Sequence, residues 1–108
     1  MIENYKIITL CGSVKFKDDF LKLQEKLALE GNIVLTPVFF DHTKVNFTDE
    51  LKQLLDDMHK RKIDLSDEIF VINKDGYIGQ STKSEIEYAI KTGKKVNYME
   101  SETEKQNK

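Results

Sequence analysis

The sequence contains little cysteine and histidine, with one cysteine and two histidines among 108 residues. A single cysteine excludes an internal disulfide framework. The few Cys and His side chains do not suffice for a structural zinc site, which usually takes four such ligands. We therefore expect no metal site.

A basic excess is also missing. The 17 lysines and arginines are balanced by 19 aspartates and glutamates, which leaves a net charge of −2. A surface that follows nucleic-acid phosphates needs a basic excess, so no nucleic-acid partner is expected. No apolar window approaches the length of a membrane span, and the start MIENYKIITL lacks the features of a secretory signal. These absences predict a cytoplasmic protein without a membrane partner.

The common nucleotide-binding motifs are absent as well. The chain has no G-x-x-x-x-G-K-[ST] phosphate loop and no G-x-G-x-x-G after its first predicted strand. ATP, GTP and dinucleotides are therefore poor candidates as ligands. A receiver-type phosphorylation site would need clustered aspartates where Cys11-Gly12-Ser13 stands.

The chain does contain a regular alternation of strand and helix patterns. Apolar, β-branched runs predict strands at 5–10, 32–36, 69–72 and 95–99. Between them, apolar residues at spacings of three and four predict helices. We expect the first helix to start at Ser13 and end at Gly31, the second to run from its cap Thr48 to Leu65, and the third to end at Gly93. The apolar face of the second helix is predicted to consist of Leu51, Leu54, Leu55 and Met58.

This order predicts an α/β fold with a parallel sheet of about four strands and helices on both faces. We assign residues 1–100 to a single domain and 101–108 to a polar tail. With strand order 2-1-3-4, the winding reverses between the first and third strands, where such sheets bind ligands. The loop at Gly12 and the loop 73–79 should then face each other across one crevice.

The loop 73–79 and the helix after it form the most informative segment. Gly76 and Gly79 lie in the loop, Ser81 and Thr82 are candidate helix caps, and Glu85 would fall in the first turn. The helix dipole would keep that carboxylate ionised, as a nucleophile or general base requires. The same residues also fit a capping box, in which Glu85 only binds the backbone of Thr82.

Other candidates have two interpretations each. Cys11 is either a buried strand-end residue or a nucleophile, and His59 is either a satisfied, partly buried residue or a catalytic one. Tyr77 either stacks on a base or covers the loop. Asp41 follows the second strand and is placed at the pocket mouth. The hydroxyl groups of Ser13, Ser81 and Thr82 either cap helices or bind a phosphate or sugar. Lys15 is either an ordinary surface charge or a further contact to that phosphate or sugar.

The segments CGSVKF, SDEIFVIN, GYIG, STKSEIEYA and GKKV together resemble the nucleoside 2-deoxyribosyltransferase superfamily, over nearly the whole chain from Ile7 to Glu100. The resemblance is greatest to its short bacterial and phage members. It implies a flavodoxin/Rossmann-like three-layer fold and cleavage or transfer at the N-glycosidic bond of a nucleoside or nucleoside 5′-monophosphate. No organic cofactor or metal is implied.

The resemblance also implies roles for individual residues. Glu85 matches the position of the superfamily's nucleophile, and Gly12, Ser13 and Lys15 match the loop that contacts the sugar or 5′-phosphate. His59 stands where better-studied members carry an acidic residue that protonates the leaving base, and Gly79 where they often carry an acidic residue or a serine. A homodimer or larger assembly is implied too, and we place the neighbour's contact at Phe39-Phe40. The alternative is a nucleotide-binding module of the same fold without chemistry.

Overall fold

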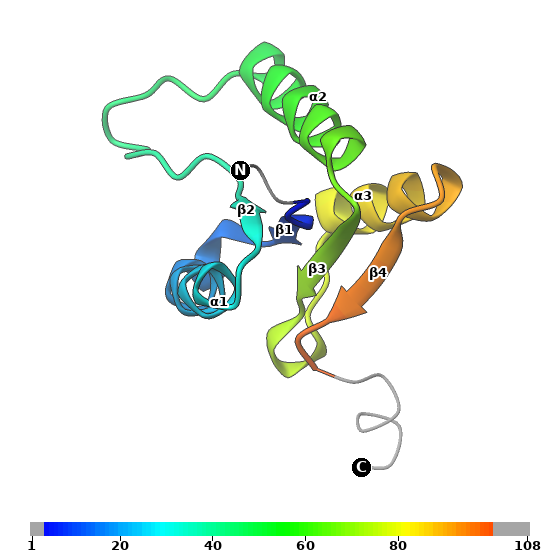
Figure 1. Ribbon diagram of the computed structural model, residues 1–108. Helices are drawn as coiled ribbons and strands as arrows, with labels where there is room; N and C mark the ends of the chain where they lie inside the picture. Colours follow the sequence, from blue (N-terminus) through cyan, green and yellow to red (C-terminus); the bar gives the residue numbers. More distant parts are fainter. Residues whose placement is uncertain (1–3, 101–108) are drawn as a thin grey trace.

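The structure of the protein, a computed structural model, describes residues 4–100, so the predicted tail at 101–108 lies outside the described residues. Strands and helices alternate along this part of the chain, and a short 3-10 helix precedes both α1 and α3 (Figure 1). The strands are β1 (Ile7–Gly12), β2 (Ile33–Leu35), β3 (Glu68–Ile72) and β4 (Lys95–Tyr98). The helices are η1 (Val14–Phe16), α1 (Lys17–Leu29), α2 (Asp49–Leu65), η2 (Lys74–Gly76) and α3 (Gln80–Lys91).

The four strands form one parallel sheet in the order β2-β1-β3-β4, which confirms the predicted order. The two central strands are in register over β3, with Leu10 opposite Phe70 and Gly12 opposite Ile72. Both strands therefore end at the same level. The loop after β1 and the loop after β3 start side by side at the point where the winding reverses.

Alternation along the central strands builds two separate cores. Ile8 and Leu10 of β1 pack with Phe20 and Leu27 of α1, whereas Cys11 packs on the opposite face of the sheet with Ile63 of α2 and Ala89 of α3. Figure 1 shows the same three layers. The first core contains Ile8, Leu10, Phe20, Leu27 and Ile72, and the second contains Cys11, Ile63, Ile69, Val71 and Ala89.

Helix α2 begins and ends as predicted, but it buries a different face. The Thr48 hydroxyl accepts a hydrogen bond from the Leu51 amide at 3.1 Å, as a cap should. Of the predicted apolar face, Leu54 and Met58 are exposed, and the fully buried residues are His59 and Ile63. The prediction was therefore wrong for Leu54 and Met58, whereas Leu51 and Leu55 are partly buried. The reason is that the end of α2 docks on the sheet, and its polar His59 is buried there.

Helix α3 begins earlier than predicted. Its N-cap is Gly79, without a side-chain cap, so Ser81 and Thr82 are not caps and lie inside the first turn. Glu85 therefore lies beyond the first turn, which the structure records as free of acidic residues. The capping-box interpretation and the predicted first-turn position of Glu85 were both wrong. The helix buries Thr82, Glu85 and Ala89, while Ile90 is exposed.

Ser13 caps the short helix η1 and not α1 itself. Its hydroxyl accepts a hydrogen bond from the Lys15 amide at 3.3 Å. The end of α1 is as predicted, because the helix stops at Leu29 and Gly31 follows with a φ of +97°. None of the helices within residues 4–100 combines the length and apolar character needed to cross a membrane.

Candidate active site

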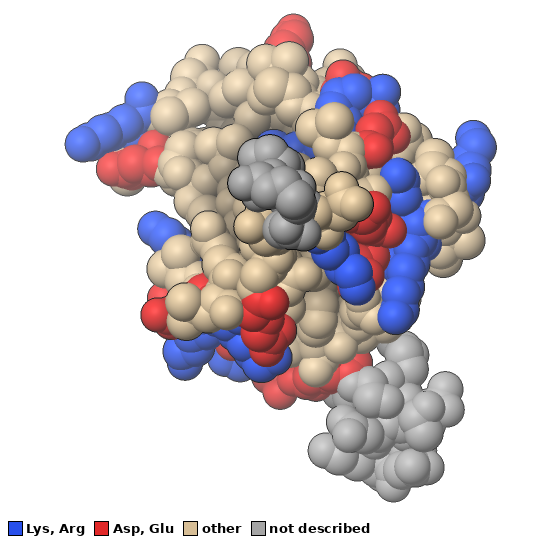
Figure 2. All heavy atoms as spheres, in the orientation of Figure 1, with Lys and Arg blue, Asp and Glu red and all other residues tan. Residues whose placement is uncertain are grey.

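A cavity of about 850 Å³ opens at the carboxyl ends of β1 and β3, where the sequence predicted a crevice. Its walls come from the loop after β1, the long loop between β2 and α2, one face of α2 and the start of α3. Ligand pockets of proteins have volumes of roughly 300–1,000 Å³, so the cavity can hold a nucleoside-sized molecule. Figure 2 shows acidic and basic side chains mixed over one face of the molecule, without a large area of one sign of charge.

Most of the predicted site residues meet in this cavity, and two do not. Lys15 lies outside it, with its Nζ 3.6 Å from the centre of the Tyr77 ring. Gly76 belongs to η2, where the amide of the neighbouring Asp75 donates a hydrogen bond to the Glu100 carboxylate at 2.9 Å. This turn is thus held by Glu100, which follows β4. The predicted residues that line the cavity are Gly12, Ser13, Asp41, His59, Tyr77, Gly79, Ser81, Thr82 and Glu85.

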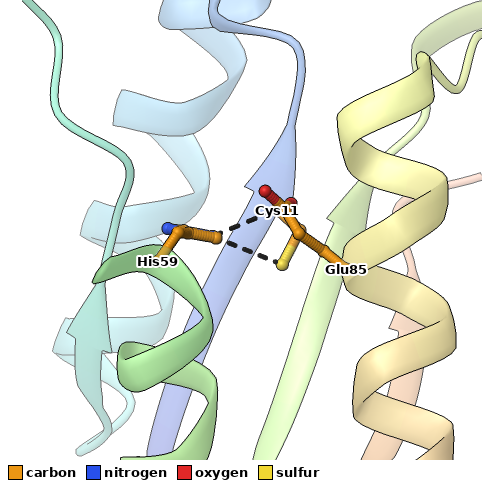
Figure 3. A group of neighbouring side chains, drawn as sticks. All are labelled: Cys11, His59 and Glu85. Atoms are coloured by element: carbon orange, nitrogen blue, oxygen red, sulfur yellow. Dashed lines mark hydrogen bonds and ion pairs between the residues drawn. The ribbon is translucent and has the colours of Figure 1, made fainter. Parts of the chain in front are cut away.

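Side chains from three different elements converge at the buried end of the cavity (Figure 3). His59 extends from α2 toward Cys11 of β1 and Glu85 of α3. Its Nε2 lies 3.5 Å from the Cys11 Sγ and 3.9 Å from the Glu85 Oε1. The relative exposures are 0% for Cys11, 5% for His59 and 8% for Glu85. The Glu85 carboxylate is therefore directed away from its own helix backbone and toward the cavity.

Burial governs the charge of these groups. Desolvation raises the pKa of Glu85 to about 7, although a hydrogen bond from the Cys11 thiol lowers it in part. Desolvation likewise lowers the pKa of His59 to about 4, with the positive charge of Lys62 acting in the same direction. Burial and the negative charge of Glu85 raise the pKa of the Cys11 thiol well above its usual value. The expectation that the helix dipole keeps Glu85 ionised was wrong, since desolvation outweighs it.

At neutral pH the centre is thus a neutral imidazole, a thiol and a carboxyl group that is about half ionised. A neutral His59 does not fit the role of a charged proton donor. Its Nδ1 is buried and has no hydrogen-bond partner within residues 4–100. The same energetics disfavour Cys11 as a nucleophile, because attack requires the thiolate. Glu85 is the group of the three that can carry a negative charge near pH 7.

Charged residues on α2 form the part of the site that sequence reasoning missed. Lys52 lines the cavity, binds the Asp56 carboxylate at 2.8 Å and lies 3.4 Å from the Ser81 hydroxyl. Lys62 donates a hydrogen bond from Nζ to the Thr36 carbonyl at 2.7 Å. The sequence did contain a signal for this face, because charged and apolar residues recur at spacings of three and four along α2 and His59 belongs to the same series. The α2 residues on this cavity face include Lys52, Leu55, Asp56, His59 and Lys62.

The long loop between β2 and α2 closes the outer side of the cavity with aromatic rings. Phe40 packs against both His42 and Phe47, at centroid distances of 4.5 and 5.8 Å, and the rings of His42 and Phe47 are 5.9 Å apart. All three rings line the cavity. Asp41 also lines it, but its carboxylate accepts hydrogen bonds from the Thr43 amide and hydroxyl at 2.9 and 2.6 Å. The loop therefore fixes its own Asp41 and offers mainly ring faces to a ligand.

Tyr77 covers the cavity from the opposite side. Its ring contacts Phe16 edge to face at a centroid distance of 5.9 Å and is about half exposed. A Cβ atom at Gly79 would lie 3.3 Å from the Tyr77 hydroxyl, so glycine leaves room for the ring. Both interpretations of Tyr77 in the sequence are compatible with this position, because the ring lines the cavity and packs on the loop.

No known family profile matches the sequence, and no curated protein sequence matches it significantly. Among solved structures, the fold is similar to that of a 2-desoxiribosyltransferase from Leishmania mexicana, with a TM-score of 0.64 and 15% sequence identity. The match covers 86% of this chain and 63% of that protein. At this identity the similarity establishes a shared fold, and this chain spans less than two thirds of the other protein's length.

Proposed function

We propose that the protein cleaves or transfers the sugar at the N-glycosidic bond of a nucleoside or nucleoside 5′-monophosphate, with Glu85 as the nucleophile. We further propose that the chain belongs to the nucleoside 2-deoxyribosyltransferase superfamily, which its sequence resembles. The similarity to the Leishmania mexicana protein supports this proposal through the shared fold and through that protein's name. No metal or organic cofactor takes part in the proposed reaction.

One observation carries the proposal. A buried carboxylate projects from α3 into a cavity of nucleoside size and is not engaged in capping its own helix. A structural role for Glu85 in a capping box would have placed it at the helix start, bonded to backbone amides. Burying a carboxyl group without a cationic partner costs folding free energy, and such costs concentrate at functional sites. Glu85 is therefore best explained by chemistry in the cavity.

In the proposed reaction, an ionised Glu85 oxygen attacks the anomeric carbon of the sugar. A bond forms between that oxygen and the anomeric carbon while the bond to the base nitrogen breaks, and the departing base takes up a proton from water in the open cavity. A second base or water then displaces Glu85, which restores the carboxylate and gives retention at the anomeric carbon. This assignment uses only the carboxylate and an oxocarbenium-like transition state near it.

We assign His59 a positioning role in this reaction. Its imidazole contacts both the Glu85 carboxylate and the Cys11 thiol, and its lowered pKa disfavours a charged acid at neutral pH. Around Glu85, the small Gly12, the Ser13 hydroxyl and the start of α3 are placed to contact the sugar. Phe40 and Tyr77 offer ring faces to the base. Lys15 and Gly76 stay outside this proposed site, because neither lines the cavity.

The test is release of free base, followed by chromatography, from a panel of nucleosides, deoxynucleosides and their 5′-monophosphates. With at least one of these, the wild-type protein should release base, and Glu85→Gln should reduce the rate by about 10³-fold or more. Glu87→Gln is the matched control, since Glu87 is exposed on the same helix, and it should keep the wild-type rate. Full turnover by Glu85→Gln would overturn the assignment.

The alternative is a nucleotide-binding module of the same fold, in which the cavity binds its ligand without catalysis. This alternative predicts saturable binding of a panel member without any release of base over long incubation.

A homodimer in which a neighbour contacts the Phe40 side of the cavity stays part of our proposal, because that wall is formed by a loop with exposed apolar side chains such as Val38 and Phe47.

A further inference from the structure

We propose that Cys11, His59 and Glu85 together form a binding site for Zn²⁺ or a similar transition-metal ion, and that the bound ion blocks the reaction at Glu85. The three residues supply one sulfur, one nitrogen and one oxygen ligand, and these atoms all lie within 4.8 Å of one another. The blocking effect depends on the proposed function. The binding site does not, because it depends on the geometry of the three side chains alone.

The geometry is close to that of a tetrahedral zinc site. Zinc–sulfur and zinc–nitrogen bonds of about 2.3 and 2.0 Å place two ligand atoms about 3.5 Å apart at the tetrahedral angle. The Cys11 Sγ and His59 Nε2 are 3.5 Å apart, and the Glu85 Oε1 is 3.9 Å from the same nitrogen. A small rotation of the Glu85 side chain would complete the set. Figure 3 shows all three side chains directed at one point between β1, α2 and α3.

The charge balance also favours a divalent ion. Ionising both Cys11 and Glu85 in this buried place costs much free energy, because the structure shows no close cation beside them among residues 4–100. A divalent ion carries the two positive charges that balance a thiolate and a carboxylate. On binding, the Cys11 thiol releases its proton to the solvent, and the resulting thiolate sulfur coordinates the ion. His59 contributes an imidazole nitrogen, which is the commonest metal ligand among protein side chains.

The ligand types select the ion. A thiolate together with an imidazole favours Zn²⁺ and its transition-metal neighbours, whereas Mg²⁺ and Ca²⁺ prefer oxygen ligands only. Three protein ligands leave one position open, and His59 and Glu85 both line the cavity, so that position faces the solvent space. Because one position stays open to the cavity, we expect reversible binding and not a closed structural zinc site.

The experiment titrates the metal-free full chain with Co²⁺, in buffer without chelator, and follows the charge-transfer absorption of a cobalt–thiolate bond. Cys11 is the only cysteine of the chain, so such a band can arise from no other residue. Zn²⁺ is then added to displace Co²⁺ and to measure its affinity. We expect one ion per chain, displacement by Zn²⁺ and no displacement by Mg²⁺.

Variants identify the ligands. Cys11→Ala should abolish the thiolate band, and Glu85→Gln and His59→Ala should each weaken binding at least about tenfold. His42→Ala is the matched control, because His42 is the other histidine and is exposed at the cavity rim, and it should bind as the wild type does. Thermal melting of each metal-free variant checks that it is folded. If Cys11→Ala is not folded, Cys11→Ser and the shift of the melting temperature of the wild type by Zn²⁺ replace it.

Binding and catalysis give distinguishable results. The site is overturned if the folded wild type shows no cobalt–thiolate band, or if Glu85→Gln and His59→Ala bind Co²⁺ as tightly as the wild type. Zn²⁺ should stop release of base at the concentration at which it binds, and EDTA should restore it. Undiminished release by zinc-saturated protein would overturn the blocking effect. Metal binding without release of base from any panel member would overturn the proposed function and leave the metal site standing.

Discussion

The imidazole Nε2 of His59 lies 3.9 Å from the Glu85 carboxylate, although the two residues belong to different helices and neither is exposed to solvent by more than a tenth. Burial shifts their pKa values in opposite directions, to about 4 for His59 and about 7 for Glu85. At neutral pH the contact therefore joins a neutral imidazole to a partly ionised carboxyl. It is not a salt bridge.

This arrangement predicts how stability depends on pH. The pKa of Glu85 is raised from 4.5 to about 7 in the folded protein, so folded Glu85 binds its proton more tightly than unfolded Glu85 does. Its contribution to stability is present below pH 4.5 and is lost as the pH rises to about 7. A shift of this size corresponds to about 3 kcal/mol.

Glu85→Gln removes that titration, so its stability relative to the wild type should rise by about 3 kcal/mol as the pH rises through this range. Urea unfolding at several pH values, with EDTA present, measures the difference. His59 titrates in the opposite sense, since its stabilising effect is lost as the pH falls from 6.5 to about 4, but it is present in both proteins. Glu87→Gln should follow the wild type. A pH-independent difference between Glu85→Gln and the wild type would refute the raised pKa.

The same titration predicts the pH dependence of the reaction. If the ionised form of Glu85 attacks the sugar, kcat/KM for a nucleoside substrate should rise about tenfold per pH unit below the pKa and become constant above it. With a pKa of about 7, the change of slope should fall near neutral pH. Initial rates of base release in EDTA between about pH 5 and about pH 8 measure it. A rate that falls across this range would show that the protonated carboxyl is the active form.

Gly12 should be needed for the junction between β1 and the cavity. A Cβ atom at Gly12 would lie 2.9 Å from the Ile72 carbonyl oxygen and 3.3 Å from the Phe20 ring. We expect Gly12→Ala to destabilise the protein by about 1–3 kcal/mol in urea unfolding, because the contact with the backbone of β3 cannot relax easily. It should also slow the release of base, since the loop after β1 would shift.

Gly93→Ala serves as the comparison for Gly12→Ala. Gly12 and Gly93 both have a positive φ, of +155° and +81°, but a Cβ atom at Gly93 would meet no atom within 4 Å. Its substitution measures the cost of backbone strain alone, about 1 kcal/mol. Equal losses of stability in the two variants would mean that the contact of the added Cβ atom with Ile72 and Phe20 costs no free energy beyond the backbone strain.

The sheet could be predicted because its signals are local. Apolar β-branched runs, short connections and the rule of right-handed crossovers leave few arrangements, and the order β2-β1-β3-β4 was among them. The start of α2 was predictable for the same reason, since Thr48 binds a backbone amide within its own turn. The crevice between the loops after β1 and β3 followed from the strand order.

The details of the site depend on tertiary contacts, and for these details the predictions from the sequence were wrong. Thr82 and Glu85 have the spacing of a capping box, but they are buried with Ala89 on the face of α3 that packs on the sheet. The helix therefore begins at the glycine before them. The apolar face of α2 was predicted from the leucines of its first half, and His59 directly follows Met58, the last residue of that face. The structure buries the second half, which brings His59 to Cys11, a contact between distant parts of the chain that no local pattern encodes.

The most direct measurement of the central claim is a search for the covalent intermediate. The wild-type protein is mixed with a substrate from which it releases base, quenched in acid during turnover and digested, and its peptides are analysed by mass spectrometry. If Glu85 is the nucleophile, the peptide that contains Glu85 gains the mass of one sugar residue, with fragmentation that places the sugar on Glu85, and Glu85→Gln shows no such peptide. Rapid release of base with no adduct, or an adduct on another residue, would contradict this role of Glu85.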